Sequence, residues 1–363
     1  MKIDYGKIIE NDFEETLYKQ RFDDLINYLN TFGSTDFWTI INEVGGSERR
    51  MLRLIDQMVK LNILEFKNNK FNLLNNESKY KNINLKELEK NLKKIWYKKP
   101  VPTLFFDQRP ITYKTSIKRV EYLLNRNDVY NKKIVFLGDD DLTSIALALT
   151  KVKCEIVALD VDERLVNFIN QIAQKYNLNL KAYVYNALNK TDSCLKHKFD
   201  CLMTDPTPEK IPFSLFMNNA INLLKKEKGV IYTSIYSSAM DKSLELQKVI
   251  NNMNLYVTDI IPNFTKYQAL YELYKPTDIE IMKKYNIAVN EDSICFTESL
   301  VRMELTNDTR KIKLNYQGKD IFGKATKRVI NNRNNDVVKI EDNYLNEVEK
   351  MIKENASKDY ISE

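Results

Sequence analysis

The repeated order of strand, turn and helix after residue 133 is the feature that most constrains the fold of this chain. Apolar runs of strand length are KIVFLG, CEIVALD, KAYVYNA, CLMTDP, GVIYTSIY and YVTDIIP. Segments of helical length lie between them, at 142–151, 162–175, 213–226 and 238–253. Apolar strands that alternate with helices are typical of a parallel sheet covered on both faces. We therefore predict an α/β domain with a Rossmann-like, mostly parallel sheet, to which ICFTESLVRMEL near 294–305 adds a late strand.

Residues 1–95 predict a separate, winged-helix-like domain. FDDLINYLN is amphipathic with a period near 3.6, and TDFWTIINEV follows it, with Thr35 or Ser34 available as the N-cap. A third helix is expected from Ser47, a favourable N-cap residue after two glycines. ILEFKNNKFNLL then has two short apolar runs around a turn signal at 67–70. Three helices followed by a hairpin are the pattern of a winged helix.

The role of this N-terminal domain has two interpretations. The third helix could contact DNA, or the domain could serve docking or dimerisation. Docking is favoured, because Arg49, Arg50 and Arg53 are too few to mark a base-reading surface. A link bounded by prolines, YKKPVPTLFFDQRP, precedes the strand–helix repeats, and we predict a catalytic domain over 96–306. Residues 307–363 are predicted to form a basic, flexible C-terminal tail.

Composition excludes several kinds of site. His197 is the only histidine, and none of the four cysteines forms a C-x-x-C pair, so a catalytic triad, a zinc ribbon and a metal site are not expected. No apolar run reaches the ~20 residues of a membrane span, and the N-terminus has no signal-peptide core, so we predict a soluble, cytoplasmic protein. The net charge of +6 permits weak association with nucleic acid but does not establish it.

Polar residues end the predicted strands where ligands bind in an open α/β sheet. The run Gly138-Asp139-Asp140-Asp141 follows the first strand, Asp160 ends the second, and Asp205 ends the fourth. An acid about twenty residues after the first turn is well placed to bind ribose hydroxyls, although Asp160 could be a simple loop acid. Asn186, at the end of the third strand, could contact adenine or could be a surface turn residue. Asp205 before Pro206 is a turn signal that would also face the reacting atoms.

Helix capping can account for one of the three adjacent aspartates but not for all three. One of them, with Asp141 the favoured candidate, could cap the helix that follows, and Asp162 is expected to cap the next helix. Adjacent carboxylates repel one another and are costly to bury, so a cluster of this kind indicates a bound cation. An organic ammonium is favoured over a metal ion, because no complementary set of metal ligands is present.

The charge of the cluster selects among nucleotide-type cofactors. The usual one for such a sheet with an acid after the second strand is S-adenosylmethionine, whose carboxylate three aspartates would repel. Decarboxylated S-adenosylmethionine keeps only the ammonium of its aminopropyl arm. The sequence therefore predicts transfer of an aminopropyl group to a polyamine, a polycation that Asp205 and Glu209 would also suit.

The region from about 104 to 305 resembles the branched-chain polyamine synthases, the N4-bis(aminopropyl)spermidine synthases of thermophilic archaea and bacteria. The matching stretches are FDQRPIT, FLGDDDLTSIALAL, ALDVDERLVNFI, KFDCLMTDPTPE, MDKSLELQ and TDIIPNFTKY. The resemblance implies decarboxylated S-adenosylmethionine as co-substrate without a prosthetic group, spermidine or a related polyamine as acceptor, and a homodimer. One departure is that the family motif D-P-P-E here reads Asp205-Pro206-Thr207-Pro208-Glu209.

Position and resemblance together assign roles to individual residues. Asp140 is the predicted catalytic carboxylate, assisted by Asp139 and Asp141. Donor-binding residues are predicted to be Gly138, Asp160, Asn186 and Gln108. Acceptor-binding residues are predicted to be Asp205, Glu209 and Glu272. In the implied mechanism the acceptor nitrogen displaces 5'-methylthioadenosine from the aminopropyl carbon, and a carboxylate takes the proton of the nitrogen.

Two other functions compete with this interpretation. An S-adenosylmethionine-dependent methyltransferase acting on amino groups of nucleic acid would use Asp205-Pro206 as part of a D-P-P-Y-type motif. No aromatic residue follows Pro206 to stack on a flipped base, which weakens that reading. A non-enzymatic regulator would combine the winged helix with a ligand-sensing domain and would bind DNA with a steep salt dependence.

Overall fold

The computed structural model describes residues 21–314 except 23, 27, 31, 75–83, 103–105, 107, 227–228, 237–239, 270–273, 275 and 291–292. The chain separates into two compact units. The first consists of Met1–Leu85 and Val120–Tyr130, and the second of Lys86–Arg119 and Asn131–Glu363. The predicted domain limits at 95 and 306 stay a prediction, and most of the predicted tail lies outside the described residues.

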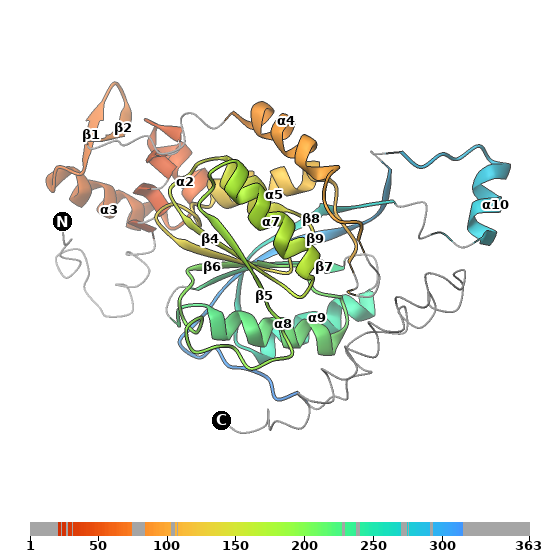
Figure 1. Ribbon diagram of the computed structural model, residues 1–363. Coiled ribbons are helices and arrows are strands. Elements are labelled where there is room, and N and C mark those ends of the chain that lie inside the picture. Colours follow the sequence, from red (N-terminus) through yellow and green to blue (C-terminus); the bar gives the residue numbers. More distant parts are fainter. Residues whose placement is uncertain are drawn as a thin grey trace. The chain divides into compact units, whose positions relative to one another are not determined.

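Among its described residues, the first unit includes helices α2 and α3 and a hairpin (Figure 1). These are α2 Phe37–Val44, α3 Glu48–Lys60, β1 Leu64–Lys67 and β2 Lys70–Leu73. The strands pair antiparallel, and the turn between them has Asn68 and Asn69 in the left-handed region that a tight hairpin requires. Apolar side chains from helical segments and from the start of β1 form its core: Leu25, Leu29, Ile40, Val44, Met51, Leu54, Ile55, Met58 and Leu64. The hairpin is confirmed, and the winged-helix assignment stays a prediction.

The starts of the two helices differ in how they are capped. Asp36 caps α2, with its side chain accepting hydrogen bonds from the backbone nitrogens of Trp38 and Thr39. The prediction of Thr35 or Ser34 as this cap is wrong, because the helix begins one residue later than the sequence pattern suggested. Ser47 occupies the N-cap position of α3 as predicted, but its hydroxyl makes no capping hydrogen bond.

The second unit is built on a seven-stranded sheet in the order β5-β4-β3-β6-β7-β9-β8. The strands from β5 to β7 are parallel, whereas β9 is antiparallel to both of its neighbours. This confirms the predicted α/β class with a mostly parallel sheet. The strands are β3 Lys133–Leu137, β4 Glu155–Asp160, β5 Leu180–Val184, β6 Cys201–Thr204, β7 Val230–Tyr236, β8 Tyr256–Gln268 and β9 Ile294–Glu304. The helices after residue 84 are α4 Leu85–Trp96, α5 Tyr113–Asn125, α6 Thr143–Leu149, α7 Glu163–Lys175, α8 Lys210–Leu223, α9 Met240–Asn252 and α10 Pro276–Lys284.

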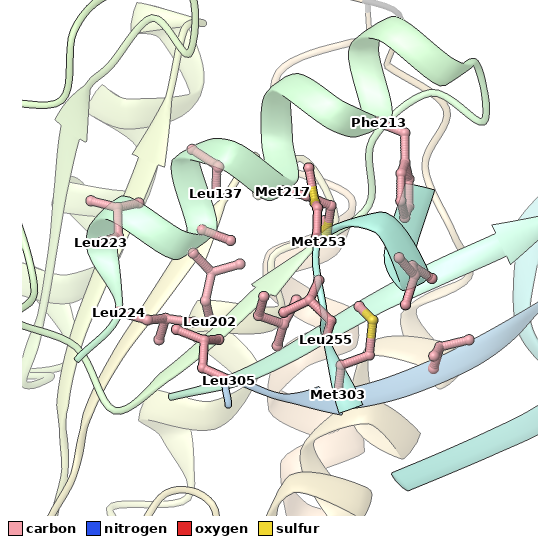
Figure 2. Close-up of a cluster of buried hydrophobic side chains, with 14 of the residues drawn as sticks. Leu137, Leu202, Phe213, Met217, Leu223, Leu224, Met253, Leu255, Met303 and Leu305 are labelled. Atoms are coloured by element: carbon pink, nitrogen blue, oxygen red, sulfur yellow. The ribbon is translucent and has the colours of Figure 1, made fainter. Parts of the chain in front are cut away.

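Helices cover both faces of the parallel strands, which explains why those strands are apolar throughout. On one face α8 and α9 pack against the sheet (Figure 2), and their core includes Phe213, Met217, Leu223, Leu246 and Val249. Alternate strand residues enter this core, as Val135 and Leu137 of β3 do, whereas α7 lies on the opposite face (Figure 1).

Two features of the second unit bear on the site. Strand β4 pairs with one edge of β3 and β6 with the other, so the strand order reverses at β3. The β3–β6 junction is therefore the topological switch point. Helix α8 begins at Lys210, three residues before the predicted start, because Pro212 is tolerated in a first helical turn. No helix among the described residues is both long and apolar enough to cross a membrane.

Candidate active site

The turn after β3 carries the three consecutive aspartates. Gly138 has a φ of 77°, a left-handed conformation that favours glycine, and its nitrogen donates to the carbonyl of Leu159 at 2.8 Å. The turn closes with Leu142, which is fully buried and also left-handed, at a φ of 51°. Helix α6 begins immediately afterwards, at Thr143. The aspartates are therefore held between two fixed points, at the carboxyl end of the strand beside the switch point.

Asp139 has the capping role that the sequence interpretation gave to Asp141. Its carboxylate accepts hydrogen bonds from the backbone nitrogen of Ser144, at 3.1 Å, and from the Ser144 hydroxyl. Burial raises the pKa of Asp139 to about 8, although the bonds from Ser144 oppose the shift. The expectation for Asp141 is wrong, because Leu142 bends the chain so that Asp139 faces the start of the helix.

Asp160 is tied to the aspartate turn by its own hydrogen bonds. Its Oδ2 accepts from the backbone nitrogen of Asp139 and its Oδ1 from that of Asp162, both at 2.9 Å. Burial raises the pKa of Asp160 to about 6, while these backbone bonds pull it down. Each oxygen can still accept a second hydrogen bond, as ribose hydroxyls would require.

Asp162 caps α7 as predicted and also engages Gln108. Its Oδ1 accepts from the backbone nitrogen of Arg164 at 3.0 Å, and its Oδ2 lies 3.1 Å from the Gln108 amide nitrogen. Burial would raise its pKa, but the bonds from Arg164 and Gln108 outweigh that effect and lower it. The predicted donor-binding residue Gln108 therefore lies buried beside the end of β4.

A buried arginine that the sequence interpretation missed joins the two acids on either side of the switch point. Arg119 of α5 places Nη1 2.8 Å from Asp141 Oδ2 and Nη2 2.5 Å from Asp205 Oδ2. Its Nη2 also donates to the hydroxyls of Ser234 and Thr265. Burial alone would lower the pKa of the guanidinium, but the charges of Asp205 and Asp141 outweigh it and raise that pKa.

Asp141 is consequently satisfied within the protein. Its Oδ1 accepts from the backbone nitrogen of Ile111 at 3.0 Å, and its backbone carbonyl accepts from the hydroxyl of Ser116. Burial raises the pKa of Asp141, and the positive charge of Arg119 partly offsets the shift. This acid is a structural anchor for the turn, bonded to the segment that precedes α5.

Asp140 and Asp205 each keep one carboxylate oxygen open. Among the described residues, Asp140 Oδ2 and Asp205 Oδ1 are buried atoms without a hydrogen-bond partner. Burial, together with the charge of Asp141, raises the pKa of Asp140 well above its ordinary value, and Lys99 opposes the shift. The two open oxygens belong to the ends of β3 and β6, which pair directly in the sheet.

Lys99 supplies a second cation at the aspartate turn. Its Nζ donates to the backbone carbonyl of Asp140 at 2.8 Å and lies 3.8 Å from the centre of the Trp96 ring. Burial lowers the pKa of Lys99, and the charges of the three aspartates raise it. The bond fixes the backbone of Asp140 and uses neither oxygen of its carboxylate.

Strand β9 adds a further buried acid to the same edge of the sheet. Glu298 lies opposite Tyr236, the last residue of β7, and accepts a 2.9 Å hydrogen bond from the Tyr267 hydroxyl. Burial, and next the charge of Asp205, raises the pKa of Glu298 to about 8. Because β9 is antiparallel, a residue near its start reaches the carboxyl ends of the parallel strands.

Three predicted residues are not joined to this cluster by the contacts that the described part of the chain makes. Glu209 is exposed and forms an ion pair with Lys242 of α9 at 2.8 Å. Asn186 follows β5, where its side-chain oxygen accepts from the backbone nitrogen of Leu188, as in a surface turn. Glu272 lies outside the described residues. No group of three or more histidine, cysteine or acidic side chains in the described chain is arranged to hold a metal ion.

Comparison with known proteins places the chain in a family. A family model, described as the branched-chain polyamine synthase A C-terminal domain, matches residues 87–329 and so contains the aspartate turn, Arg119, Asp205 and Glu298. The chain belongs to the branched-chain polyamine synthase A family. The resemblance drawn from the sequence motifs is thereby confirmed.

Individual relatives agree with the family. The chain is 34% identical over 201 residues to an uncharacterized protein of Methanocaldococcus jannaschii, covering 55% of this chain and 51% of that protein. It is 32% identical over 232 residues to the N(4)-bis(aminopropyl)spermidine synthase of the same organism, covering 62% and 65%. To the synthase of that name from Thermococcus kodakarensis it is 36% identical over 185 residues, covering 50% and 53%. The matches thus span between about half and about two thirds of the length of these relatives.

A solved structure shows the same fold. The branched-chain polyamine synthase from Thermus thermophilus, crystallised with N4-aminopropylspermidine and 5'-methylthioadenosine, matches with a TM-score of 0.54 and 19% identity. The match covers 86% of this chain and 95% of that chain. At this level of identity the likeness supports the shared fold.

Proposed function

We propose that this chain is an aminopropyltransferase that moves aminopropyl groups from decarboxylated S-adenosylmethionine to the N4 nitrogen of spermidine. The observation that carries the proposal is the pair of open carboxylate oxygens, Asp140 Oδ2 and Asp205 Oδ1, at neighbouring strand ends beside the switch point. A buried acceptor without a partner is costly, and an ammonium or amine ligand would supply the missing donors.

The proposed chemistry uses the raised pKa of Asp140. A carboxylate that prefers to be protonated is a stronger base than an ordinary aspartate, so it can take the proton that the attacking secondary amine must lose. The nitrogen lone pair forms the new bond to the aminopropyl carbon, and the carbon–sulfur bond breaks with its electron pair passing to sulfur. The sulfonium becomes the neutral thioether of 5'-methylthioadenosine.

A second transfer to the same nitrogen would need a different contribution from the acids. The neutral tertiary amine has no proton to lose after its attack, and its product is a quaternary cation. There the open oxygens of Asp140 and Asp205 would stabilise the developing positive charge. One arrangement therefore supports both additions, and the names of the relatives, which describe bis(aminopropyl) products, favour the double transfer.

The donor is proposed to lie toward β4. Asp160 would accept hydrogen bonds from the ribose hydroxyls, while Gly138, which has no side chain, allows a close approach to the turn. The aspartates would repel the carboxylate of intact S-adenosylmethionine and favour the decarboxylated form. We further propose that the enzyme acts in the cytoplasm as a homodimer and needs no prosthetic group.

The experiment supplies purified full-length protein with spermidine and, in separate reactions, decarboxylated or intact S-adenosylmethionine. Release of 5'-methylthioadenosine and the mass of the polyamine are followed, and the same preparation is examined by sedimentation for the dimer. A gain of one or two aminopropyl units from the decarboxylated donor alone is expected. Absence of that product would contradict the proposal, and methylation of nucleic acid by the intact donor would then favour the methyltransferase.

A further inference from the structure

We propose that Arg119 is a positioning residue for the aminopropyl transfer: it clamps Asp141 and Asp205 so that the open oxygens of Asp140 and Asp205 face the acceptor amine together. The inference rests on the proposed function, which assigns the reaction to these acids. Arg119 itself has no role in that assignment, and we give it none in proton transfer.

The contacts of the guanidinium reach several separate strands. One nitrogen, Nη1, binds Asp141 in the turn after β3, and the other, Nη2, binds Asp205 after β6. Nη2 also reaches Ser234 of β7 at 3.0 Å and Thr265 of β8 at 3.3 Å. A single side chain from α5 therefore fixes the relative positions of the strand ends that carry the reacting acids.

Arg119 does not bind the Asp205 oxygen that is proposed to face the acceptor amine. Arg119 takes Asp205 Oδ2, and Asp205 Oδ1 remains without a partner among the described residues. Because the carboxylate is planar, binding one oxygen fixes the direction of the other. On the other side Asp141 is held at both oxygens, by Arg119 and by the Ile111 nitrogen, so the adjacent Asp140 is set by the same clamp.

An arginine suits this task better than a lysine. Its planar fork presents separate donors in fixed directions, so one guanidinium can bind two carboxylates from different strands. A lysine ammonium is a point charge on a flexible stem, and it would favour one of the two acids. The positive charge also offsets part of the repulsion among the clustered carboxylates.

A purely structural role is the competing explanation, and the chain offers a matched control. Arg302 of β9 is also buried, and its Nη1 forms a 2.6 Å ion pair with Glu304 and a hydrogen bond with Thr258. Its Nε donates to the Tyr232 hydroxyl. Both arginines hold acids inside the same unit, so loss of either should lower stability, but Arg119 alone of the two clamps Asp141 and Asp205.

The two explanations differ in the pH dependence of the reaction. The titratable groups around the guanidinium are Asp141 in the turn after β3, Asp205 after β6, Tyr267 on β8 and Glu298 on β9, and the charge of Lys99 interacts with the aspartate turn. Arg119 lowers the pKa of Asp141 and that of Glu298, so without its positive charge these two acids hold more protons at a given pH. The acidic limb of the rate profile should then move to higher pH.

The test compares Arg119→Lys and Arg119→Met with Arg302→Lys and Arg302→Met in the full chain. We expect Arg119→Met to lower kcat by about 100-fold, as misplaced reacting groups do, with Arg119→Lys intermediate. The acidic limb of kcat/KM should shift upward in Arg119→Met and less in Arg119→Lys, which keeps the positive charge, and KM for the donor should stay within about threefold. The Arg302 variants should lose thermal stability without a change in the pH profile.

Each outcome decides between the explanations. If Arg119→Lys and Arg119→Met lose no more activity than the Arg302 variants, or if Arg119→Met keeps the wild-type pH profile, Arg119 is structural and the inference is overturned. Should Arg119→Met fail to fold by circular dichroism, Arg119→Lys carries the same comparison. A wild-type protein that transfers no aminopropyl group overturns the proposed function itself, and the inference with it, which separates the two failures.

Discussion

The acids at the end of β4 and those at the β3–β6 junction lie along one edge of the sheet and are treated differently by the chain. Both oxygens of Asp160 accept backbone hydrogen bonds, and both oxygens of Asp162 are bonded as well. Asp140 and Asp205, in contrast, each keep a buried oxygen without a partner among the described residues. Acids that the chain satisfies itself suit a neutral part of a ligand, and acids that it leaves open suit a charged part.

The difference also has an energetic side. A buried carboxylate that accepts several hydrogen bonds has a stabilised charge, whereas an open one is driven toward its protonated form. The pKa values follow this order: burial raises that of Asp160 to about 6, while that of Asp140 is raised well above its ordinary value. We infer that Asp140 and Asp205 bind a cation, whereas Asp160 and Asp162 do not. The following predictions test this difference.

The largest effect is expected from Asp140→Asn. An amide cannot accept the proton of the attacking amine, so kcat should fall by about 100- to 10,000-fold, the usual contribution of a general base. The fold should be retained, because a neutral side chain replaces a carboxyl whose burial opposes ionisation. Turnover of 5'-methylthioadenosine at saturating substrates measures the loss.

The control for this substitution is Asp200→Asn. Asp200 precedes β6, at the end of that strand opposite Asp205, where it accepts from the Lys133 backbone nitrogen and pairs with Lys225. The activity of the Asp200→Asn variant should stay within about threefold of wild type. Near-normal turnover in Asp140→Asn would remove Asp140 from the proton-accepting role.

A smaller effect is expected from Asp160→Asn, which changes an acid whose two oxygens both accept backbone hydrogen bonds. The amide keeps one acceptor oxygen, so one of the backbone bonds from Asp139 and Asp162 is lost along with part of the proposed ribose site. KM for the donor should rise about tenfold, which corresponds to one weakened hydrogen bond to a charged group. Steady-state kinetics should show KM for spermidine unchanged, and a fall in kcat alone would contradict the donor-binding role.

The smallest effect concerns stability and Glu298. Burial raises the pKa of Glu298 from 4.5 to about 8, so the folded state holds a proton that the unfolded state has already released at intermediate pH. Stability should therefore fall as pH rises from about 4.5 to about 8, and level off above that range. Glu298→Gln should remove part of this slope, raising stability at pH 8 by an amount on the order of 1–2 kcal/mol.

Urea denaturation at pH 5 and pH 8 measures this difference. The glutamine oxygen can still accept the hydrogen bond from Tyr267, so the variant isolates the charge. Asp139 and Asp160 also have raised pKa values and keep part of the slope in the variant. Parallel pH profiles for wild type and Glu298→Gln would show that Glu298 does not hold a proton in the folded protein.

Much of the second unit could be predicted from the sequence, because its signals are local. Continuous apolar runs gave the strands, and the polar residues that end them gave Asp139, Asp140, Asp141, Asp160 and Asp205. Boundaries were less accurate where one residue decides the geometry, as with Asp36 at the start of α2 and Pro212 in the first turn of α8. Hydrogen bonds between neighbours along the chain could not be ranked without coordinates, which is why Asp141 was expected to cap α6.

The residues that sequence reasoning missed come from distant segments. Arg119 lies 22 positions from Asp141 and 86 from Asp205, and Glu298 reaches the site only because β9 runs antiparallel. A weak signal for Arg119 did exist: it shares a helical face with Ser116 and Leu123, so a charge sits among residues at buried spacing. The partner of such a charge is set by tertiary packing, which the periodicity of one helix does not contain.

Leu142 shows how a hydrophobic residue determines the placement of a polar turn. The left-handed backbone costs a residue with a Cβ atom about 1–2 kcal/mol, while complete burial of a leucine side chain contributes about 1.5–3 kcal/mol. Packing thus outweighs the conformational penalty. Glycine at this position would relax the backbone and remove the anchor, and a β-branched residue would worsen the backbone strain. The placement of the acids in the turn therefore depends on a leucine that takes no part in the chemistry.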